Sequence, residues 1–510
     1  MALDAAGGGP RLRSPKIVII GAGMTGIASH IRLREAGIPV ENITILEKAD
    51  RVGGTWRDNT YPGVACDVPS HHYAFSFEPY AWSHQCAEGA EIQGYMEMVS
   101  AKYGVTDNVR FGEAVTACRY DGAGRWLVET DQGGRFEADF VLSATGVLHH
   151  PNVPKIDGLE CFAGAMWHSA EWRNDVDLEG KRIGVIGNGS TAHQFIPHLI
   201  NAGHETTVFM RTPQWVFPNP RLAYSETMKR RWREKPERMR FWKGVGKWFM
   251  EQFFVKATIG RPFQNWVLNR IVRNHLRLAV KDRALRAKLT PDYGVGCKRM
   301  ILDSTFYPAI QKPNAHLETT AIERIEPGGV RLTDGRLIAL DVLILATGFQ
   351  NFSFMRPMDL VGADGLSIDE AWAEGRYDCY NSVHLPGFPN FFLMLGPTTP
   401  VGNNSVIAMT ETQLGYIEQI IDLWRRGEAD AVDVRPEAMD AYRAFVKKGF
   451  DGTVWVSGCQ SWYLDGDGMP AIWPYDWPDF VKLMAAPKRE ELALTTHRPA
   501  ETAQAATSDA

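Results

Sequence analysis

Long apolar runs are absent from this chain of 510 residues. No segment approaches the ~18 consecutive apolar residues that a membrane-spanning helix needs. The first stretch, MALDAAGGGPRLRSPK, lacks the apolar core of a signal peptide. Together these two absences predict a cytoplasmic protein.

Cysteine is sparse and scattered. The seven cysteines form no C-x-x-C pair, which argues against a zinc site or a disulfide framework. We therefore expect mostly reduced thiols and no bound metal. The net charge of −5 argues against nucleic acid as the main partner. The length allows two or three domains.

A glycine-rich turn follows the first strand-like run. Residues 16–26, KIVIIGAGMTG, place Gly21, Gly23 and Gly26 between an apolar run and a helix-like segment. The next strand-like run, NITILE, ends in Glu47. Glycines let the backbone approach a pyrophosphate at a helix N-terminus, and an acid about 20 residues later can bind a ribose diol. This combination predicts dinucleotide binding.

A second turn repeats the pattern with one change. Residues 182–192, RIGVIGNGSTA, carry Gly187, Gly189 and Ala192, and the next strand-like run ends in Arg211 rather than an acid. An arginine at this position pairs with a 2′-phosphate, so it favours NADP over NAD. The alternative is a solvated arginine at the end of a strand.

Each glycine turn is followed by a similar segment. Residues 118–146 and 323–348 both contain short strand-like runs between glycine-rich turns, then an aspartate, an apolar run and A-T-G. This repeat predicts a small meander that returns to the parent sheet in each of two similar domains. The fold class is therefore α/β, with two Rossmann-like dinucleotide-binding domains, one for FAD and one for NADP, and a helical insertion.

The predicted order of segments interleaves the two domains along the chain. The FAD-binding domain begins at 14–150 and resumes at 351–485. The linker and the first segment of the NADP-binding domain occupy 151–215, and that domain resumes at 291–350. The helical insertion lies between them at 216–290, and a disordered tail is expected at 486–510.

Residues 221–290 are strongly basic. They hold 19 Lys+Arg and 5 Asp+Glu, a net of +14, so the remainder carries −19. Four tryptophans are interleaved with these charges: Trp232, Trp242, Trp248 and Trp266. The favoured interpretation is a solvated helical face with its aromatic residues packed inward. Electrostatic attraction of NADPH is a second interpretation, and contact with an anionic membrane surface is a weaker third.

The segment between the two turns reads FAGAMWHSAEW, in the pattern F-x-G-x-x-x-H-x-x-x-W over residues 162–172. This pattern resembles the signature of the type I Baeyer–Villiger monooxygenases, within the class B flavin-dependent monooxygenases. The resemblance covers about residues 14–480 and includes GGTWRDNTYPGVACDVPSHHY at 53–73 and CKRMILDSTFYP at 297–308. Arg173 departs from the proline or aspartate that usually follows the signature tryptophan.

The resemblance implies an activity. NADPH would reduce FAD, oxygen would form a flavin C4a-peroxide, and a ketone would become an ester or lactone. The alternative is oxidation of nitrogen or sulfur atoms by a related flavin monooxygenase. A disulfide reductase would need a cysteine partner for Cys66, and a non-catalytic flavoprotein would only bind NADP. The ketone class and the oligomeric state stay open.

The resemblance also implies roles for individual residues. Arg299 would lie over the flavin, Asp67 would pair with it, and Trp462 would belong to a loop that closes over NADP and substrate. The segment 162–172 would couple the two domains: Gly164 through unusual backbone angles, His168 by bridging backbone groups, and Phe162, Trp167 and Trp172 by burial. Asn403 and Asn404 are further candidates near the flavin. Taken with the two glycine turns, we expect FAD or NADP to contact Gly21, Gly23, Gly26, Glu47, Gly54, Thr55, Trp56, Asp67, Tyr73, Gly187, Gly189, Ser190, Thr191, Gln194, Arg211, Thr212, Lys298 and Arg299.

Overall fold

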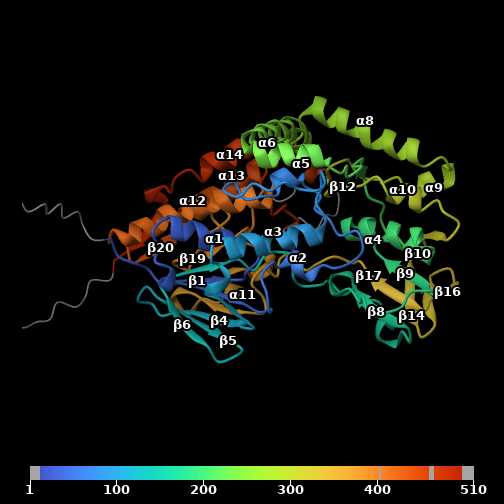
Figure 1. The fold of residues 1–510 in the computed structure, drawn as a ribbon. Helices are drawn as coiled ribbons and strands as arrows, with labels where there is room; N and C mark the ends of the chain where they lie inside the picture. The colour runs from blue at the N-terminus through green and yellow to red at the C-terminus, as the bar shows by residue number, and fades with distance from the viewer. Residues whose placement is uncertain (1–11, 401–403, 459–463, 497–510) are drawn as a thin grey trace, which may run out of the picture.

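Two five-stranded parallel sheets form the two halves of the molecule in the computed structural model (Figure 1). The structure describes residues 12–400, 404–458 and 464–496. The first sheet has the order β19-β7-β1-β2-β3. Its strands are β1 (Ile17–Ile20), β2 (Ile43–Glu47), β3 (Val109–Phe111), β7 (Phe140–Ser143) and β19 (Phe391–Leu393). Strands β1 and β7 are buried along their whole length, as expected for a parallel sheet covered on both faces.

The second sheet repeats this design with the order β13-β10-β9-β17-β8. Its strands are β8 (Ala165–His168), β9 (Arg182–Ile186), β10 (Glu205–Phe209), β13 (Ala315–Glu318) and β17 (Val342–Leu345). Helix α1 (Met24–Glu35) follows β1, and helix α4 (Ser190–Asn201) follows β9. The predicted α/β fold with two Rossmann-like units is therefore confirmed.

Each predicted meander exists and returns to its parent sheet. In the first half it consists of β4 (Val115–Tyr120), β5 (Trp126–Thr130) and β6 (Arg135–Ala138), joined by β18 (Asp359–Val361). In the second half it consists of β14 (Ile322–Glu326), β15 (Gly329–Leu332) and β16 (Leu337–Ala339). Strands β7 and β17 then enter the parent sheets beside β1 and β9.

The A-T-G segments lie against the glycine turns. Gly21 has a φ of 102°, and a Cβ there would come within 2.8 Å of the Ala144 carbonyl oxygen. Gly187 has a φ of 111°, and a Cβ there would come within 2.3 Å of the Ala346 carbonyl oxygen. Only glycine satisfies both the backbone angle and the close approach, so the repeat in sequence reflects the same packing in both halves.

Residues 226–288 form the helices of the basic segment. These are α5 (Glu226–Glu234), α6 (Pro236–Met250), a π-helical turn (Glu251–Val255), α7 (Lys256–Thr258), α8 (Pro262–Ala279) and α9 (Arg283–Lys288). Trp232 is buried, but Trp248 and Trp266 are exposed. The expectation that the aromatic side chains pack inward is therefore wrong for these two residues. The predicted domain boundaries themselves stay a prediction.

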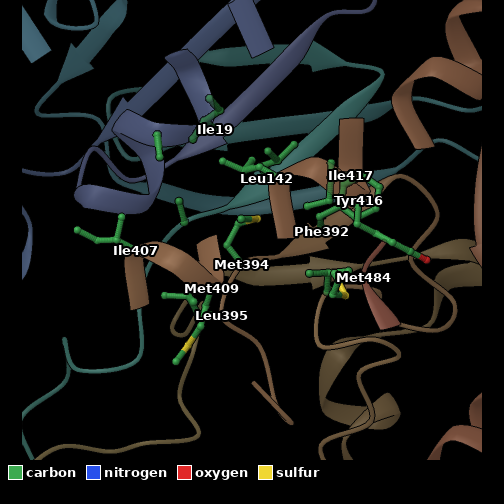
Figure 2. Close-up of a cluster of buried hydrophobic side chains, with 14 of the residues drawn as sticks. Ile19, Leu142, Phe392, Met394, Leu395, Ile407, Met409, Tyr416, Ile417 and Met484 are labelled. Carbon is green, nitrogen blue, oxygen red and sulfur yellow. The ribbon is translucent and has the colours of Figure 1, made fainter. Parts of the chain in front are cut away.

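The C-terminal segment completes the first half. Figure 2 shows Ile19 and Leu142 of the first sheet packed with Phe392, Tyr416 and Ile417. The last two come from α12 (Val406–Arg425), which precedes β20 (Ala431–Val434), α13 (Pro436–Gly449) and α14 (Trp477–Leu483). The shorter elements are α2 (Thr55–Asp58), α3 (Gly89–Lys102), β11 (Val216–Phe217), β12 (Ile301–Leu302), α10 (Phe306–Ala309) and α11 (Ile368–Ala371).

The predicted disordered tail begins too early. Strand β21 (Leu492–Thr495) pairs antiparallel with β20, and Leu492 is buried. The polar, alanine-rich composition did not predict this strand, because a single strand that pairs at one edge needs few apolar residues. Residues 497–510 lie outside the described ranges. Among the described residues, no helix is both long and apolar enough to cross a membrane.

Candidate active site

The first glycine turn leaves the start of helix α1 open to an anion. Gly23 is the N-cap of α1, it makes no side-chain cap, and no acid lies in the first turn. Gly54 approaches it so closely that a Cβ on Gly54 would lie 3.2 Å from the Gly23 Cα. The uncapped N–H groups and the floor of bare backbone fit the pyrophosphate of a dinucleotide.

Glu47 lies at the end of β2, close to this turn. Its carboxylate accepts hydrogen bonds from the backbone N–H groups of Ala22 (2.7 Å) and Ala49 (3.0 Å). It also pairs with Arg57 at 3.0 Å, and both side chains are buried. A carboxylate offers about four acceptor positions, so this fixed group still has room to accept a ribose hydroxyl.

The second glycine turn presents the start of α4 in the same way. Gly189 is its N-cap without a side-chain cap, and a Cβ there would meet nothing within 4 Å. Ser190 and Thr191 form the first turn of the helix. The Thr212 carbonyl oxygen, just after β10, accepts a hydrogen bond from Asn188 Nδ2 at 3.1 Å. Open space above an uncapped helix start fits a second pyrophosphate.

Two cations lie beside this second turn. Lys298 Nζ lies 4.6 Å from the centroid of the Tyr293 ring. Burial lowers the pKa of Lys298, and the nearby positive charge of Arg211 lowers it further, while Asp292 opposes both. Within the described residues of the chain, neither Arg211 nor Lys298 has an ion-pair partner. Two adjacent cations with no ion-paired carboxylate fit a doubly charged phosphate.

Asp67 and Arg299 come together although they are 232 positions apart in the sequence. The Asp67 Oδ2 and Arg299 Nη2 atoms are 3.9 Å apart, and Asp67 is largely buried. Burial raises the pKa of Asp67, while the charges of Arg299 and Arg221 act to lower it. Arg221, which the sequence did not single out, also donates to the Gly63 carbonyl oxygen at 3.2 Å.

Gln194 links helix α4 of the second half to the loop that carries Asp67. Its Nε2 donates to Asp67 Oδ1 (3.2 Å) and to the Ala65 carbonyl oxygen (3.0 Å). Its Oε1 accepts from Tyr61 Oη (3.0 Å) and the Ala65 N–H (3.2 Å). Gln194 was expected to help bind NADP, and the structure also gives it four hydrogen bonds to the opposite half. The role of Tyr61 was not predicted, although Tyr61 lies in the segment 53–73 that carries the family resemblance, because its partner Gln194 is 133 positions away in the sequence.

Two aromatic side chains of the flavin signature contact each other. Trp56 lies in α2, after Thr55, and its Nε1 donates to Tyr73 Oη at 3.0 Å. The two rings pack edge to face with centroids 5.5 Å apart. Tyr73 is buried next to Cys66, the residue before Asp67. The structure therefore places these aromatic rings next to the Asp67 loop.

The segment 162–172 is not a free linker. Residues 165–168 form β8, an edge strand that pairs with β17 of the second sheet. Gly164 does not have a positive φ, so the expectation of unusual backbone angles there is wrong. Glycine is required there because a Cβ would come within 2.3 Å of the Asp341 carbonyl oxygen. Phe162 and Trp167 are buried, as expected, but Trp172, which was also expected to be buried, is only partly buried.

His168 and Trp172 lie at the end of this segment. His168 is buried, which lowers its pKa, and its Nδ1 accepts from the Ala170 N–H at 3.1 Å. The ring of Trp172 packs against Tyr61 (centroids 6.5 Å apart) and Phe195 of α4 (5.1 Å). Trp172 therefore contacts both halves of the molecule: Tyr61 in the loop of the first half, and Phe195 in helix α4 of the second half. Gln194 joins the same loop to the same helix.

Some expectations fall outside the described residues or differ from them. Trp462 and Asn403 lie outside those ranges, and Asn404 is seen to accept a hydrogen bond from the Ser405 N–H. Five described cysteines are free thiols, in agreement with the expectation of mostly reduced thiols, whereas Cys297 is disulfide-bonded. No metal-binding group of side chains occurs among the residues described.

Comparison with known proteins identifies the family. A pyridine nucleotide-disulphide oxidoreductase family model matches residues 18–239. A Baeyer–Villiger monooxygenase of Streptomyces coelicolor is 38% identical over 470 residues, which covers 91% of this chain and 90% of the relative. This chain belongs to the Baeyer–Villiger monooxygenase family. A Baeyer–Villiger monooxygenase of Pseudomonas aeruginosa is 36% identical over 455 residues, 89% of this chain and 86% of that relative.

Solved structures agree with this family. A steroid monooxygenase bound to NADP matches with a TM-score of 0.83 and 28% identity, over 95% of this chain and 100% of that chain. A closed cyclohexanone monooxygenase matches with a TM-score of 0.82 and 27% identity, over the same shares. The Baeyer–Villiger monooxygenase described here is thus a flavin-dependent enzyme that uses FAD and NADPH.

Proposed function

We propose that this Baeyer–Villiger monooxygenase inserts one atom of O2 next to the carbonyl of a small ketone and releases an ester or lactone. The observation that carries the proposal is the pair of Asp67 and Arg299, 3.9 Å apart. Gln194 holds Asp67 from the helix that follows the second glycine turn. FAD, when bound, accepts hydride from NADPH and activates dioxygen.

Arg299 provides the positive charge that ester formation requires. The oxygen derived from activated dioxygen attacks a ketone carbonyl when it is anionic, whereas its protonated form attacks sulfur or nitrogen instead. A guanidinium about 4 Å from an oxygen anion stabilises that anion by on the order of 4 kcal/mol at an effective dielectric near 20. Arginine keeps this charge at every working pH. Asp67 offsets part of the charge, and it orients the guanidinium through their ion pair.

Arg211 and Lys298 select NADPH in this proposal. Neither forms an ion pair with a carboxylate among the described residues, although Asp292 lies near enough to Lys298 to raise its pKa, so the 2′-phosphate would supply the remaining negative charge. Ser190 and Thr191 lie at the helix start, where their N–H groups face an anion. Gly189 leaves room for the phosphates.

Trp172 and Gln194 couple the two halves in this proposal. Each contacts the loop that leads to Asp67, Trp172 through Tyr61 and Gln194 directly. A shift of helix α4 would therefore move Asp67 relative to Arg299. Phe162, Gly164 and His168 fix strand β8, and Trp172 follows that strand after one short turn.

A substrate panel tests the proposal. The purified enzyme with FAD and NADPH is given aryl, linear and cyclic ketones in ¹⁸O₂, and the products are identified by mass. We expect NADPH oxidation that rises with a ketone and an ester that carries one ¹⁸O. Sulfides and amines serve as the competing panel. Oxidation of these without any ester would favour the heteroatom-oxidising alternative. The cytoplasmic location and the absence of a nucleic-acid partner stay predictions.

A further inference from the structure

Helix α6 turns an apolar stripe away from the body of the protein. Met239 is buried, and a Cβ at Gly246 would come within 2.8 Å of His72 Nε2, so this side of the helix faces inward. Phe241, Val245 and Trp248 recur at i, i+4 and i+7, about half a turn away from the inward side. Phe241 is 65% exposed and Trp248 is 62% exposed.

Helix α8 has the same character. Its buried side is formed by Leu268, Val272 and Leu276. The opposite side begins with Phe263 and Trp266, whose rings stack with centroids 6.5 Å apart. These two side chains are 70% and 63% exposed.

Arginine follows the aromatic residues along this outer side. Arg270 and Arg277 are exposed, and they lie one and three turns beyond Trp266 on the same face. No acidic residue occurs in α8 from Pro262 to Ala279. Helices α6 and α8 lie along the same edge of the molecule, at the top of Figure 1. We call the exposed residues Phe241, Val245, Trp248, Phe263, Trp266, Arg270 and Arg277 the α6–α8 surface.

The charge of the chain is segregated toward this edge. Residues 221–290 carry a net of +14, and the rest of the chain carries −19. Large exposed aromatic side chains are costly in water unless another phase or partner covers them. Aromatic side chains prefer the boundary between water and hydrocarbon, and arginines on the same face attract anionic headgroups. Charge and apolar exposure together therefore suit an anionic lipid surface better than a neutral partner.

We propose that the α6–α8 surface docks the enzyme peripherally on anionic lipid bilayers. The aromatic side chains enter the headgroup region, and the arginines contact the lipid phosphates. This docking is independent of the ketone proposal, because none of these residues belongs to the active-site groups described above.

Vesicle flotation with the FAD-loaded enzyme tests the docking. One set of vesicles contains equal amounts of phosphatidylcholine and phosphatidylglycerol, and the other contains phosphatidylcholine alone. We expect binding to the anionic set, weakened by salt. Trp248→Ser with Trp266→Ser should weaken partitioning at least about tenfold. Arg270→Glu with Arg277→Glu should weaken it at least about 30-fold, at roughly 1 kcal/mol for each lost arginine.

Matched controls separate the surface from general effects. Lys155→Glu with Lys312→Glu makes the same change in net charge at exposed positions elsewhere, and Leu337→Ser with Val153→Ser removes exposed apolar side chains elsewhere. Both controls should bind vesicles like the wild type, and all variants should keep the flavin absorbance and NADPH oxidation. The proposal is overturned if the wild type does not float, or if controls and surface variants lose binding equally. It is also overturned if the wild type is a dimer that binds neither set of vesicles and the surface variants are monomers.

Discussion

The choice between NADPH and NADH depends on Arg211 and Lys298. A charge-assisted hydrogen bond to a phosphate contributes about 1.5–3 kcal/mol, which corresponds to roughly 10- to 150-fold in kcat/KM. The two cations repel each other, which contributes to the lowered pKa of Lys298, and a bound 2′-phosphate would relieve that repulsion. Arg211→Ala and Lys298→Met should therefore each lower kcat/KM for NADPH by about this factor. NADH lacks the phosphate, so its kcat/KM should not change.

Steady-state kinetics with both coenzymes measure this preference. Methionine at position 298 has an unbranched apolar side chain of similar length, so it can stay beside the Tyr293 ring, over which Lys298 Nζ lies, while the charge is lost. Lys312→Met, an exposed lysine elsewhere in the second half, is the matched control and should leave the ratio of the two coenzymes unchanged. An unchanged ratio in both Arg211→Ala and Lys298→Met would refute the assignment of the 2′-phosphate site.

Three further predictions address pH and packing. Burial raises the pKa of Asp67, so its ionised form is lost as the pH falls through a value above the ordinary ~3.9, and kcat/KM should fall with it. Asp67→Asn should remove this fall of kcat/KM at low pH, and a fall that remains in the variant would contradict the role of Asp67. Burial raises the pKa of Asp433 to about 6, so the folded state binds more protons than the unfolded state between about pH 4 and 6. The free energy of unfolding should therefore fall by up to about 3 kcal/mol as the pH rises through this window. Urea titrations should show that Asp433→Asn lacks this fall, and an equal fall in the variant would refute it. Gly164→Ala should lower the free energy of unfolding by about 1–3 kcal/mol, because its Cβ would meet the Asp341 carbonyl oxygen at 2.3 Å. Gly328→Ala, whose Cβ would meet nothing within 4 Å, should leave stability unchanged, and equal melting temperatures of the two variants would contradict this reasoning.

The features of the fold that depend on short-range patterns were predictable from the sequence. Gly21 and Gly187 are needed for turns whose angles and close contacts exclude any side chain, so the same residue type recurs in both halves. Glu47 ends strand β2 and Arg211 comes two residues after strand β10, which places both next to the turns. Apolar runs before each turn became the buried strands of the two sheets.

The family resemblance implied the pair of Asp67 and Arg299, but other contacts between distant segments were not predicted. Gln194 meets Asp67 from a helix 127 positions away, and no local pattern encodes that contact. The outward orientation of Trp248 and Trp266 depends on which face of each helix the rest of the protein covers. The burial of Leu492 likewise depends on pairing with β20.

Arg299 supports ester formation in the proposed reaction, and the yield of ester per NADPH oxidised measures that role. The wild type and Arg299→Ala are compared with a ketone that the panel identifies, after flavin absorbance confirms that both bind FAD. Arg299→Lys, which keeps the charge but not the planar fork, should recover only a fraction of the yield. We expect Arg299→Ala to oxidise NADPH, to release hydrogen peroxide and to form almost no ester. Ester formation by Arg299→Ala at nearly the wild-type yield would contradict this role.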